Sequence, residues 1–219
     1  MISDYLKAGY PSLCILTQEP DRPESLPFRT EHWDFFCWDC LRGIRQFPKP
    51  QVVDEIRDPV EAIQWLAHRQ DTMLLTHNLH LFLDIPEVIP AIQNGVSRWK
   101  ASGCCLLMVA PVIGMRPELE KLFTIIDLPL PDEEALFNLQ MELAGSVRVD
   151  PGQDAVRAAK GLTECEAETA FALSLIKEGR FSTRVVSEAK AQAKGIPILL
   201  RQGKAFVPSW ISISIANCL

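Results

Sequence analysis

The sequence has no run of Lys or Arg, no apolar stretch long enough to cross a membrane and no even set of cysteines. Its 22 basic residues are scattered among 28 acidic ones, which leaves a formal net charge of −6. Binding to a phosphate backbone needs a concentrated basic surface, so we do not expect nucleic acid to be the partner.

The longest nearly uninterrupted apolar run, CCLLMVAPVIGM, has 12 residues at 104–115. A membrane-spanning helix needs about 20 residues. The start of the chain, MISDYLKAGYPSLCILT, lacks a basic region followed by an apolar core and a small-residue cleavage site. We therefore expect a soluble protein without membrane contact, in the cytoplasm or in a reducing compartment such as the plastid stroma.

Seven cysteines, an odd number, fit free thiols better than a disulfide framework. Two of them form a Cys-x-x-C pair, Cys37 and Cys40, within FFCWDCLRG. This spacing raises the possibilities of a redox dithiol and of half a zinc site. On a strand, however, residues three apart point to opposite faces of the sheet. We expect both to be structural thiols of a sheet, as we do for the adjacent Cys104 and Cys105, and we expect no bound metal.

A weaker metal signal is His77-Asn-Leu-His80, with Asp84 nearby. If these residues bound a metal ion, the protein could be a metal-dependent enzyme. However, a His-x-x-His pair outside a helix has no fixed geometry. Polar residues at the end of a strand are a simpler explanation of the pattern. The sequence contains no G-x-S-x-G, H-E-x-x-H or G-x-G-x-x-G motif. Gly203–Lys204 lacks the spacing of a phosphate-binding loop.

Five short apolar runs recur, and helix or turn signals follow them. In most of them apolar side chains occupy both alternating sets, as in parallel strands covered by helices on both faces. This order predicts an open α/β sheet with right-handed crossovers. The runs are SLCILT (12–17), HWDFFCWDC (32–40), TMLLTH (72–77), CCLLMVA (104–110) and FTIID (123–127).

Helix signals separate the later strands. Asp58, Pro59 and Glu61 fit an N-cap, a first helical position and a capping box. Val88, Ile92, Val96 and Trp99 recur on one face of a second predicted helix.

After Pro131 the pattern becomes helical, with Thr163 and Glu166 as a further capping box. We therefore predict three parts. These are an α/β core over 1–130, a helical subdomain over 131–195 and a divergent apolar tail over 196–219.

Several stretches, quoted below, resemble the N-terminal, degenerate ATPase-like domain of AAA proteins first known as a conserved hypothetical reading frame of plastids and cyanobacteria. The resemblance covers the chain to about residue 195. It implies a P-loop-NTPase-like (AAA) parallel sheet of about five strands with a C-terminal helical lid. In those proteins a competent AAA module follows. The stretches are APV (110–112), PELEK (117–121), DLPLPDEE (127–134) and GLTECEAETA (161–170).

The same resemblance locates where an ATPase would carry its motifs. After the first strand this chain has QEPDRPES in place of a Gly- and Lys-containing phosphate loop, and the third strand ends in THNLH without an Asp-Glu pair. The sensor position is Ala110–Pro111, and PELEKLF offers no arginine finger. The charged residues that would position the phosphates for phosphoryl transfer are missing, so we expect no ATP hydrolysis. No cofactor is expected, and ATP with Mg²⁺ would bind only if the degenerate loop retains affinity.

The resemblance therefore implies a non-catalytic module for protein interaction or oligomerisation. Expected partners are its own copies, a competent AAA module or a regulated target. Two alternatives remain open: the N-terminal part of a longer AAA ATPase, and a divergent nucleotide- or metal-binding enzyme. The interface rim that we predict at the nucleotide-side edge of the sheet comprises Glu19, Asp21, Arg22, His77, His80, Arg116, Glu118 and Lys121.

Overall fold

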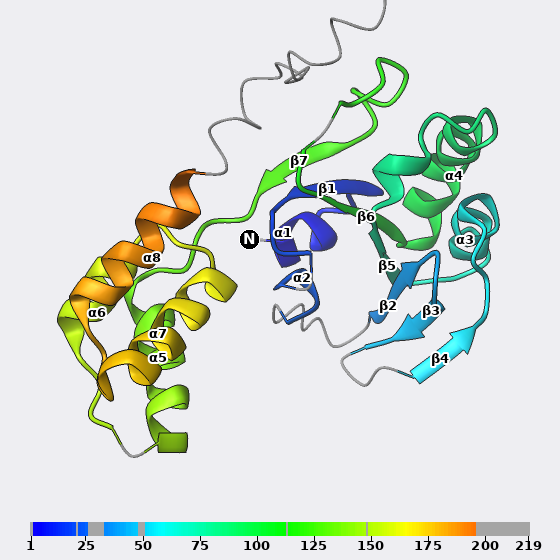
Figure 1. The fold of residues 1–219 in the computed structure, drawn as a ribbon. Coiled ribbons are helices and arrows are strands. Elements are labelled where there is room, and N and C mark those ends of the chain that lie inside the picture. The colour runs from blue at the N-terminus through cyan, green and yellow to red at the C-terminus, as the bar shows by residue number, and fades with distance from the viewer. Residues whose placement is uncertain are drawn as a thin grey trace, which may run out of the picture. The chain divides into compact units, whose positions relative to one another are not determined.

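A computed structural model describes residues 2–20, 22–25, 33–47, 51–112, 114–147 and 149–195 (Figure 1). The chain divides into two units, Met1–Pro129 and Leu130–Leu219, which we call the sheet unit and the helical unit. The apolar tail predicted for 196–219 lies outside the described residues. None of the helices in the described ranges is long and apolar enough to span a membrane.

All five predicted apolar runs form strands, and these strands are parallel in the order β2-β5-β6-β1-β7. One row across the sheet joins Cys37, Leu75, Leu107 and Leu13, and all four side chains are fully buried. This burial explains why the strands read as continuous apolar runs. The strands are β1 (Ser12–Leu16), β2 (Asp34–Asp39), β5 (Thr72–His77), β6 (Cys105–Ala110) and β7 (Thr124–Asp127).

The sheet has seven strands, against the five or so that we predicted. The two additional strands, β3 (Gly43–Gln46) and β4 (Gln51–Asp54), extend the sheet beyond β2 in antiparallel pairing. Gly43 allows this, since it has a φ of 75° and any Cβ there would lie 2.5 Å from the Asp54 carbonyl oxygen. Each strand has only four residues and β4 is largely exposed, so neither presents a recognisable apolar run.

Helices cover both faces of the sheet, and each face has its own core. On one face, α3 (Pro59–Leu66) and α4 (Val88–Ser102) pack over side chains that include Trp38, Leu74 and Leu106. On the other face, α1 (Ile2–Lys7) covers the opposite set of strand residues. The sheet unit is therefore a three-layer α/β arrangement, which agrees with the predicted fold class.

The predicted N-cap and first helical position of α3 are confirmed. The carboxylate of Asp58 accepts hydrogen bonds from the backbone N–H groups of Val60 (2.8 Å) and Glu61 (2.9 Å), and Pro59 takes the first helical position. In α4, three of the four predicted face residues, Val88, Ile92 and Trp99, are fully buried, and Val96 is half-buried.

The helical unit contains four helices in its described residues, and these pack around the fully buried ring of Phe171. The predicted capping box at Thr163 and Glu166 is confirmed, because each side chain accepts a hydrogen bond from the other residue's backbone N–H. The helix after it ends at Gly179, whose φ is 65°. The helices are α5 (Glu133–Val147), α6 (Gln153–Ala159), α7 (Glu164–Glu178) and α8 (Thr183–Gly195).

Candidate functional site

The loops that follow the five parallel strands leave the sheet at one edge, which we call the carboxyl edge. In open α/β sheets, ligands bind outside the carboxyl ends of the strands. Most of the polar residues that the sequence pointed to belong to these loops, so the carboxyl edge is the candidate site.

The loop after β1 folds back on itself. A hydrogen bond also connects it to Pro129, the second residue after the end of β7. The backbone N–H of Glu19 donates to Thr17 Oγ1 (3.0 Å), and the backbone N–H of Arg22 donates to the Glu19 carbonyl (3.3 Å). The Arg22 guanidinium donates to the Pro129 carbonyl (2.8 Å) and lies 3.6 Å from the Glu19 carboxylate. Both side chains are 13% exposed or less.

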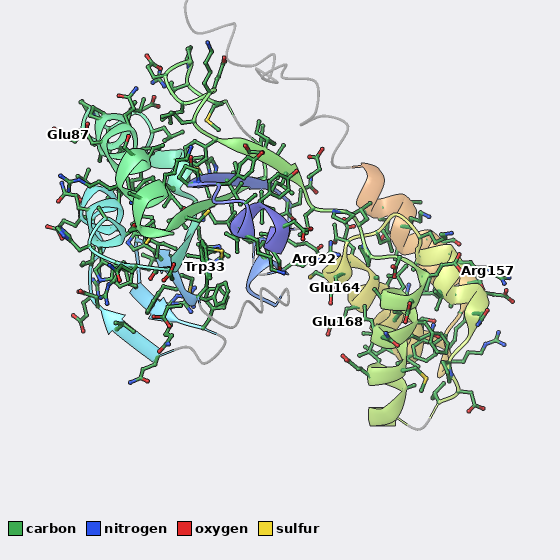
Figure 2. All side chains as sticks on the ribbon, turned by 180° about the vertical axis from the view of Figure 1, so that it is seen from behind. Arg22, Trp33, Glu87, Arg157, Glu164 and Glu168 are labelled. Atoms are coloured by element: carbon green, nitrogen blue, oxygen red, sulfur yellow. The ribbon has the colours of Figure 1, made fainter. Side chains whose placement is uncertain are left out.

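This arrangement has an electrostatic consequence. The charge of Arg22, which is labelled in Figure 2, is shared between a carboxylate and a carbonyl of its own chain. Arg22 begins α2 (Arg22–Ser25), a single short turn. The predicted rim residue Asp21, between these groups in sequence, lies outside the described residues.

His77 is buried at the end of β5, and the loop after it begins with Asn78 in the left-handed conformation (φ 58°) and continues as the 3₁₀ turn η1 (Leu79–Phe82). Burial lowers the pKa of His80, because the imidazolium form loses hydration there. The Nδ1 atom of His80 is buried without a hydrogen-bond partner. His80 therefore favours the neutral state.

The structure does not gather His77, His80 and Asp84 into a metal site. Asp84 instead forms an ion pair with Arg116 of the loop after β6. Within the described ranges, no group of three or more His, Cys, Asp or Glu side chains could hold a metal ion. The ion pair connects two loops that are 32 residues apart in sequence.

The other two predicted rim residues, Glu118 and Lys121, belong to the loop between β6 and β7 and are exposed. Leu119 between them is fully buried and packs against the core beneath α3 and α4. The loop is therefore anchored by an apolar side chain while its charged residues face solvent.

One polar cluster at the carboxyl edge escaped the sequence analysis. The carboxylate of Asp39, at the end of β2, accepts hydrogen bonds from the backbone N–H groups of Leu41 and Arg42 and from the Arg42 side chain (2.8 Å). Arg45 reaches the same carboxylate at 3.3 Å. A signal was present, since Asp at the start of a turn commonly binds the backbone two residues on.

The ionisation of Asp39 follows from these contacts. Burial acts to raise the pKa of Asp39, but the N–H groups of Arg42 and Leu41 and the Arg42 guanidinium outweigh it and lower the pKa below its ordinary value. Asp39 is therefore a fixed carboxylate that shapes the turn between β2 and β3.

Large apolar side chains are exposed in the loops at this edge. Leu41 after β2, Leu81 after β5 and Val112 after β6 are 76%, 68% and 69% exposed. The ring centroids of Trp38 and Phe82 lie 5.9 Å apart. This contact connects the end of β2 to η1. The edge therefore combines exposed apolar side chains with paired charges.

The four cysteines that the sequence analysis assigned to the sheet lie in or against its cores. Cys37 and Cys40 contact the cores on opposite faces of the sheet, and the same holds for Cys105 and Cys104. All six described cysteines are free thiols. Burial raises the pKa of the Cys14 thiol to about 12, so little thiolate forms near neutral pH.

Comparison with known proteins identifies relatives of both sequence and fold. The family model described as "SpoVK-like AAA ATPase, N-terminal domain" matches residues 1–128. No curated protein matches the chain.

Among solved structures, the FIGL-1 AAA domain in complex with ADP has a TM-score of 0.59 at 11% identity, over 92% of this chain and 74% of that one. The E. coli MS115-1 HORMA:CdnC:Trip13 complex has a TM-score of 0.53 at 12% identity, over 87% and 77%. C. elegans PCH-2 has a TM-score of 0.40 at 12% identity, and the match covers 62% of this chain and 45% of the PCH-2 chain. The two higher scores show that the fold is that of an AAA domain.

Proposed function

Since the chain belongs to the family of SpoVK-like AAA ATPase N-terminal domains, we propose that it is a non-catalytic AAA-type module for protein interaction. Its carboxyl edge contacts a protein where a competent ATPase would bind nucleotide. We also propose that the helical unit is a lid subdomain and that the chain is related to the plastid and cyanobacterial proteins. Its location in the cytoplasm or another reducing compartment is part of the same proposal.

The closure of the loop after β1 is the observation that carries this proposal. A phosphate-binding loop presents unpaired backbone N–H groups and a cationic side chain to the ligand. Here the backbone N–H groups of Glu19 and Arg22 are bonded within the loop, and the Arg22 guanidinium is bonded to Pro129. A phosphate would have to compete with the Glu19 carboxylate for this cation.

The ends of the neighbouring strands support the same proposal. β5 ends at His77 and Asn78 follows it, so no Asp-Glu pair is available there to hold Mg²⁺. Ala110 ends β6 and has no polar side chain to sense a phosphate. Arg116 in the next loop is paired with Asp84.

The exposed apolar side chains favour a protein as the partner. Exposed apolar patches on soluble proteins commonly mark interaction sites, and Leu41, Leu81 and Val112 all follow ends of parallel strands. One of the similar structures, the E. coli MS115-1 HORMA:CdnC:Trip13 complex, is an assembly of several proteins. We propose that the partner of this edge is a competent AAA module, as in a longer ATPase that begins with such a domain.

Binding to the AAA module of a SpoVK-like ATPase, purified separately, tests the proposal. We expect Leu81→Glu and Val112→Glu to weaken binding about tenfold or more, since each places a charge in an apolar contact. The matched control is Ile125→Glu, since Ile125 is 52% exposed on β7. Equal binding by all variants and the unmodified chain would contradict the proposed role of the edge.

A further inference from the structure

A groove of about 400 Å³ lies between α3 and α4, and it is formed by residues other than those of the carboxyl-edge loops. Sites for small molecules are commonly concave, with an apolar lining and a few polar groups that orient the ligand. This groove has both components. Its floor consists of Ile63 and Ala67 from α3 and of Ala91 and Gly95 from α4, and polar side chains form its rim.

The fold holds the floor of the groove in place. Both helices lead into the amino ends of neighbouring parallel strands, β5 and β6, so they run in the same direction (Figure 1). The backbone N–H of Asp71 donates to the Ser102 carbonyl (2.9 Å), which connects the segment after α3 to the end of α4. The Trp99 ring is fully buried and occupies the space that a side chain at Gly95 would need. The groove is therefore pre-formed, and a core tryptophan supports it.

An unpaired donor lies beneath this floor. Trp99 Nε1 is buried without a hydrogen-bond partner. It is bonded to Cε2, which lies 2.6 Å from the position that a Cβ on Gly95 would take. Buried donors in proteins are nearly always paired, and an unpaired one commonly indicates a bound water or ion nearby. The polarity of the floor at Gly95 therefore favours a ligand with acceptor atoms over a purely apolar one.

The rim consists of four exposed side chains that carry N–H donors. In the described part of the chain, none of these side chains forms an ion pair or a hydrogen bond with another residue. No Asp or Glu lines the groove, although the chain carries a net charge of −6. The groove is therefore a local concentration of available donors in an acidic protein. The rim side chains are Gln64 and His68 of α3 and the residues after it, and Asn94 and Arg98 of α4.

These features select the chemical class of the ligand. The planar guanidinium of Arg98 can donate two parallel hydrogen bonds to a carboxylate or a phosphate. The amides of Gln64 and Asn94 and the imidazole of His68 can donate to further oxygen atoms. A bare inorganic anion would leave the apolar floor in contact with water, and a neutral apolar molecule would leave the donors that it covers unpaired. An organic anion satisfies both the floor and the rim.

We propose that the α3–α4 groove binds a small organic anion. Its carboxylate or phosphate group pairs with Arg98, and its flat apolar body lies on Ala67, Ala91 and Gly95. The volume of the groove suits a ligand of the size of a metabolite. No residue of the carboxyl edge takes part, so this site does not depend on the proposed function.

Two-dimensional ¹H–¹⁵N NMR titration of the 219-residue chain with four probes tests the site. Phenyl phosphate and benzoate combine an anionic group with a flat apolar body. Inorganic phosphate lacks the apolar body, and benzamide has the shape of benzoate without its charge. We expect phenyl phosphate or benzoate to shift the backbone amide signals of α3 and α4 with a Kd that is roughly millimolar, as is usual for ligands of this size. Inorganic phosphate and benzamide should bind at least about fivefold more weakly, because each lacks one of the two components.

The comparison of phenyl phosphate with benzoate identifies which anionic group the groove prefers. Tighter binding of phenyl phosphate indicates a phosphate ligand, and tighter binding of benzoate indicates a carboxylate. The proposal is overturned if neither probe shifts the signals of α3 and α4, or if the shifts occur instead at the carboxyl edge. Equal binding of benzoate and benzamide would also contradict it, because the anionic group would then contribute nothing.

Substitutions on α4 assign the roles of rim and floor. Arg98→Gln should raise the Kd of the better probe roughly fivefold, since it removes the guanidinium. Lys100→Gln removes an equal charge from an exposed position of the same helix outside the groove, and it should leave the Kd unchanged. Ala91→Leu narrows the floor and should weaken binding of the aromatic probes while Arg98 is retained. An equal effect of Arg98→Gln and Lys100→Gln would overturn the site, and an unchanged thermal midpoint verifies that the variants are folded.

Discussion

The sheet unit and the helical unit are stabilised in different ways. In the sheet unit, large side chains from adjacent strands fill two cores, one on each face of the sheet. The helical unit has one core, in which four of the nine buried residues are alanines and Phe171 is the only buried aromatic residue within the described part of the chain. Alanine buries little area, so this core depends heavily on one ring.

Polar contacts also stabilise the helical unit. The capping box of Thr163 and Glu166 starts α7, and Glu178 pairs with Arg184 beyond the end of that helix. In the sheet unit, the ion pairs of Glu19, Asp39 and Asp84 lie at the carboxyl edge. Burial of apolar strands therefore accounts for the sheet, and polar contacts shape the loops at its edge.

Replacement of Phe171 by Ala should show the largest effect. We expect a loss of roughly 3–5 kcal/mol, from lost burial and the cavity that remains, which approaches the whole stability of a unit this small. Scanning calorimetry should then resolve a separate transition for the helical unit at lower temperature. As a comparison, Leu107→Ala, in the middle of the sheet, should instead lower the main transition. If both variants shift one common transition equally, the two units do not differ as described.

Asp39→Asn should show the next largest effect. The carboxylate holds the β2–β3 turn through two backbone N–H groups and Arg42, and hydrogen bonds to charged groups contribute roughly 1.5–3 kcal/mol. The pKa of Asp39 is lowered on folding. Its contribution is therefore complete above the unfolded pKa of about 3.9 and is lost as the pH falls through the folded value.

Urea unfolding at several pH values measures that dependence. The difference in unfolding free energy between the unmodified chain and Asp39→Asn should be largest at neutral pH and should shrink in acid. Asp127→Asn, at an exposed position at the end of β7, is the control and should show little change. A difference that does not depend on pH would refute the electrostatic explanation.

Thr163→Ala should have the smallest effect of the three. The Thr163 side chain caps α7 by accepting a hydrogen bond from the Glu166 backbone N–H, and loss of such a cap costs about 1 kcal/mol. Thr163→Ser keeps the hydroxyl and should retain most of the stability. Circular dichroism at 222 nm during urea unfolding reports this difference, and equal losses for Ala and Ser would exclude capping as the cause.

Most of the fold could be predicted from the pattern of apolar residues in the sequence. The five parallel strands could be predicted because both of their faces are covered, and the caps at Asp58 and Thr163 because capping depends on residues close in sequence. β3 and β4 could not be predicted, since a short exposed edge strand such as β4 has no distinctive pattern.

The contacts of the site were mostly beyond the reach of sequence reasoning. Arg22 bonds to Pro129, 107 residues away, and Asp84 bonds to Arg116 across two loops. Only the folded sheet brings such residues together. The pairing of Asp84 with Arg116, rather than with the two histidines near it in sequence, likewise depends on the folded sheet.

Thermal unfolding with and without excess Mg-ADP tests the central claim most directly, with the FIGL-1 AAA domain, whose structure contains ADP, as the positive control. A ligand at 100 times its Kd adds about 2.7 kcal/mol of stability, which moves the midpoint visibly. We predict that the midpoint of this chain stays unchanged while that of the control rises. A clear rise for this chain would contradict the account, because the closed loop after β1 would then bind nucleotide.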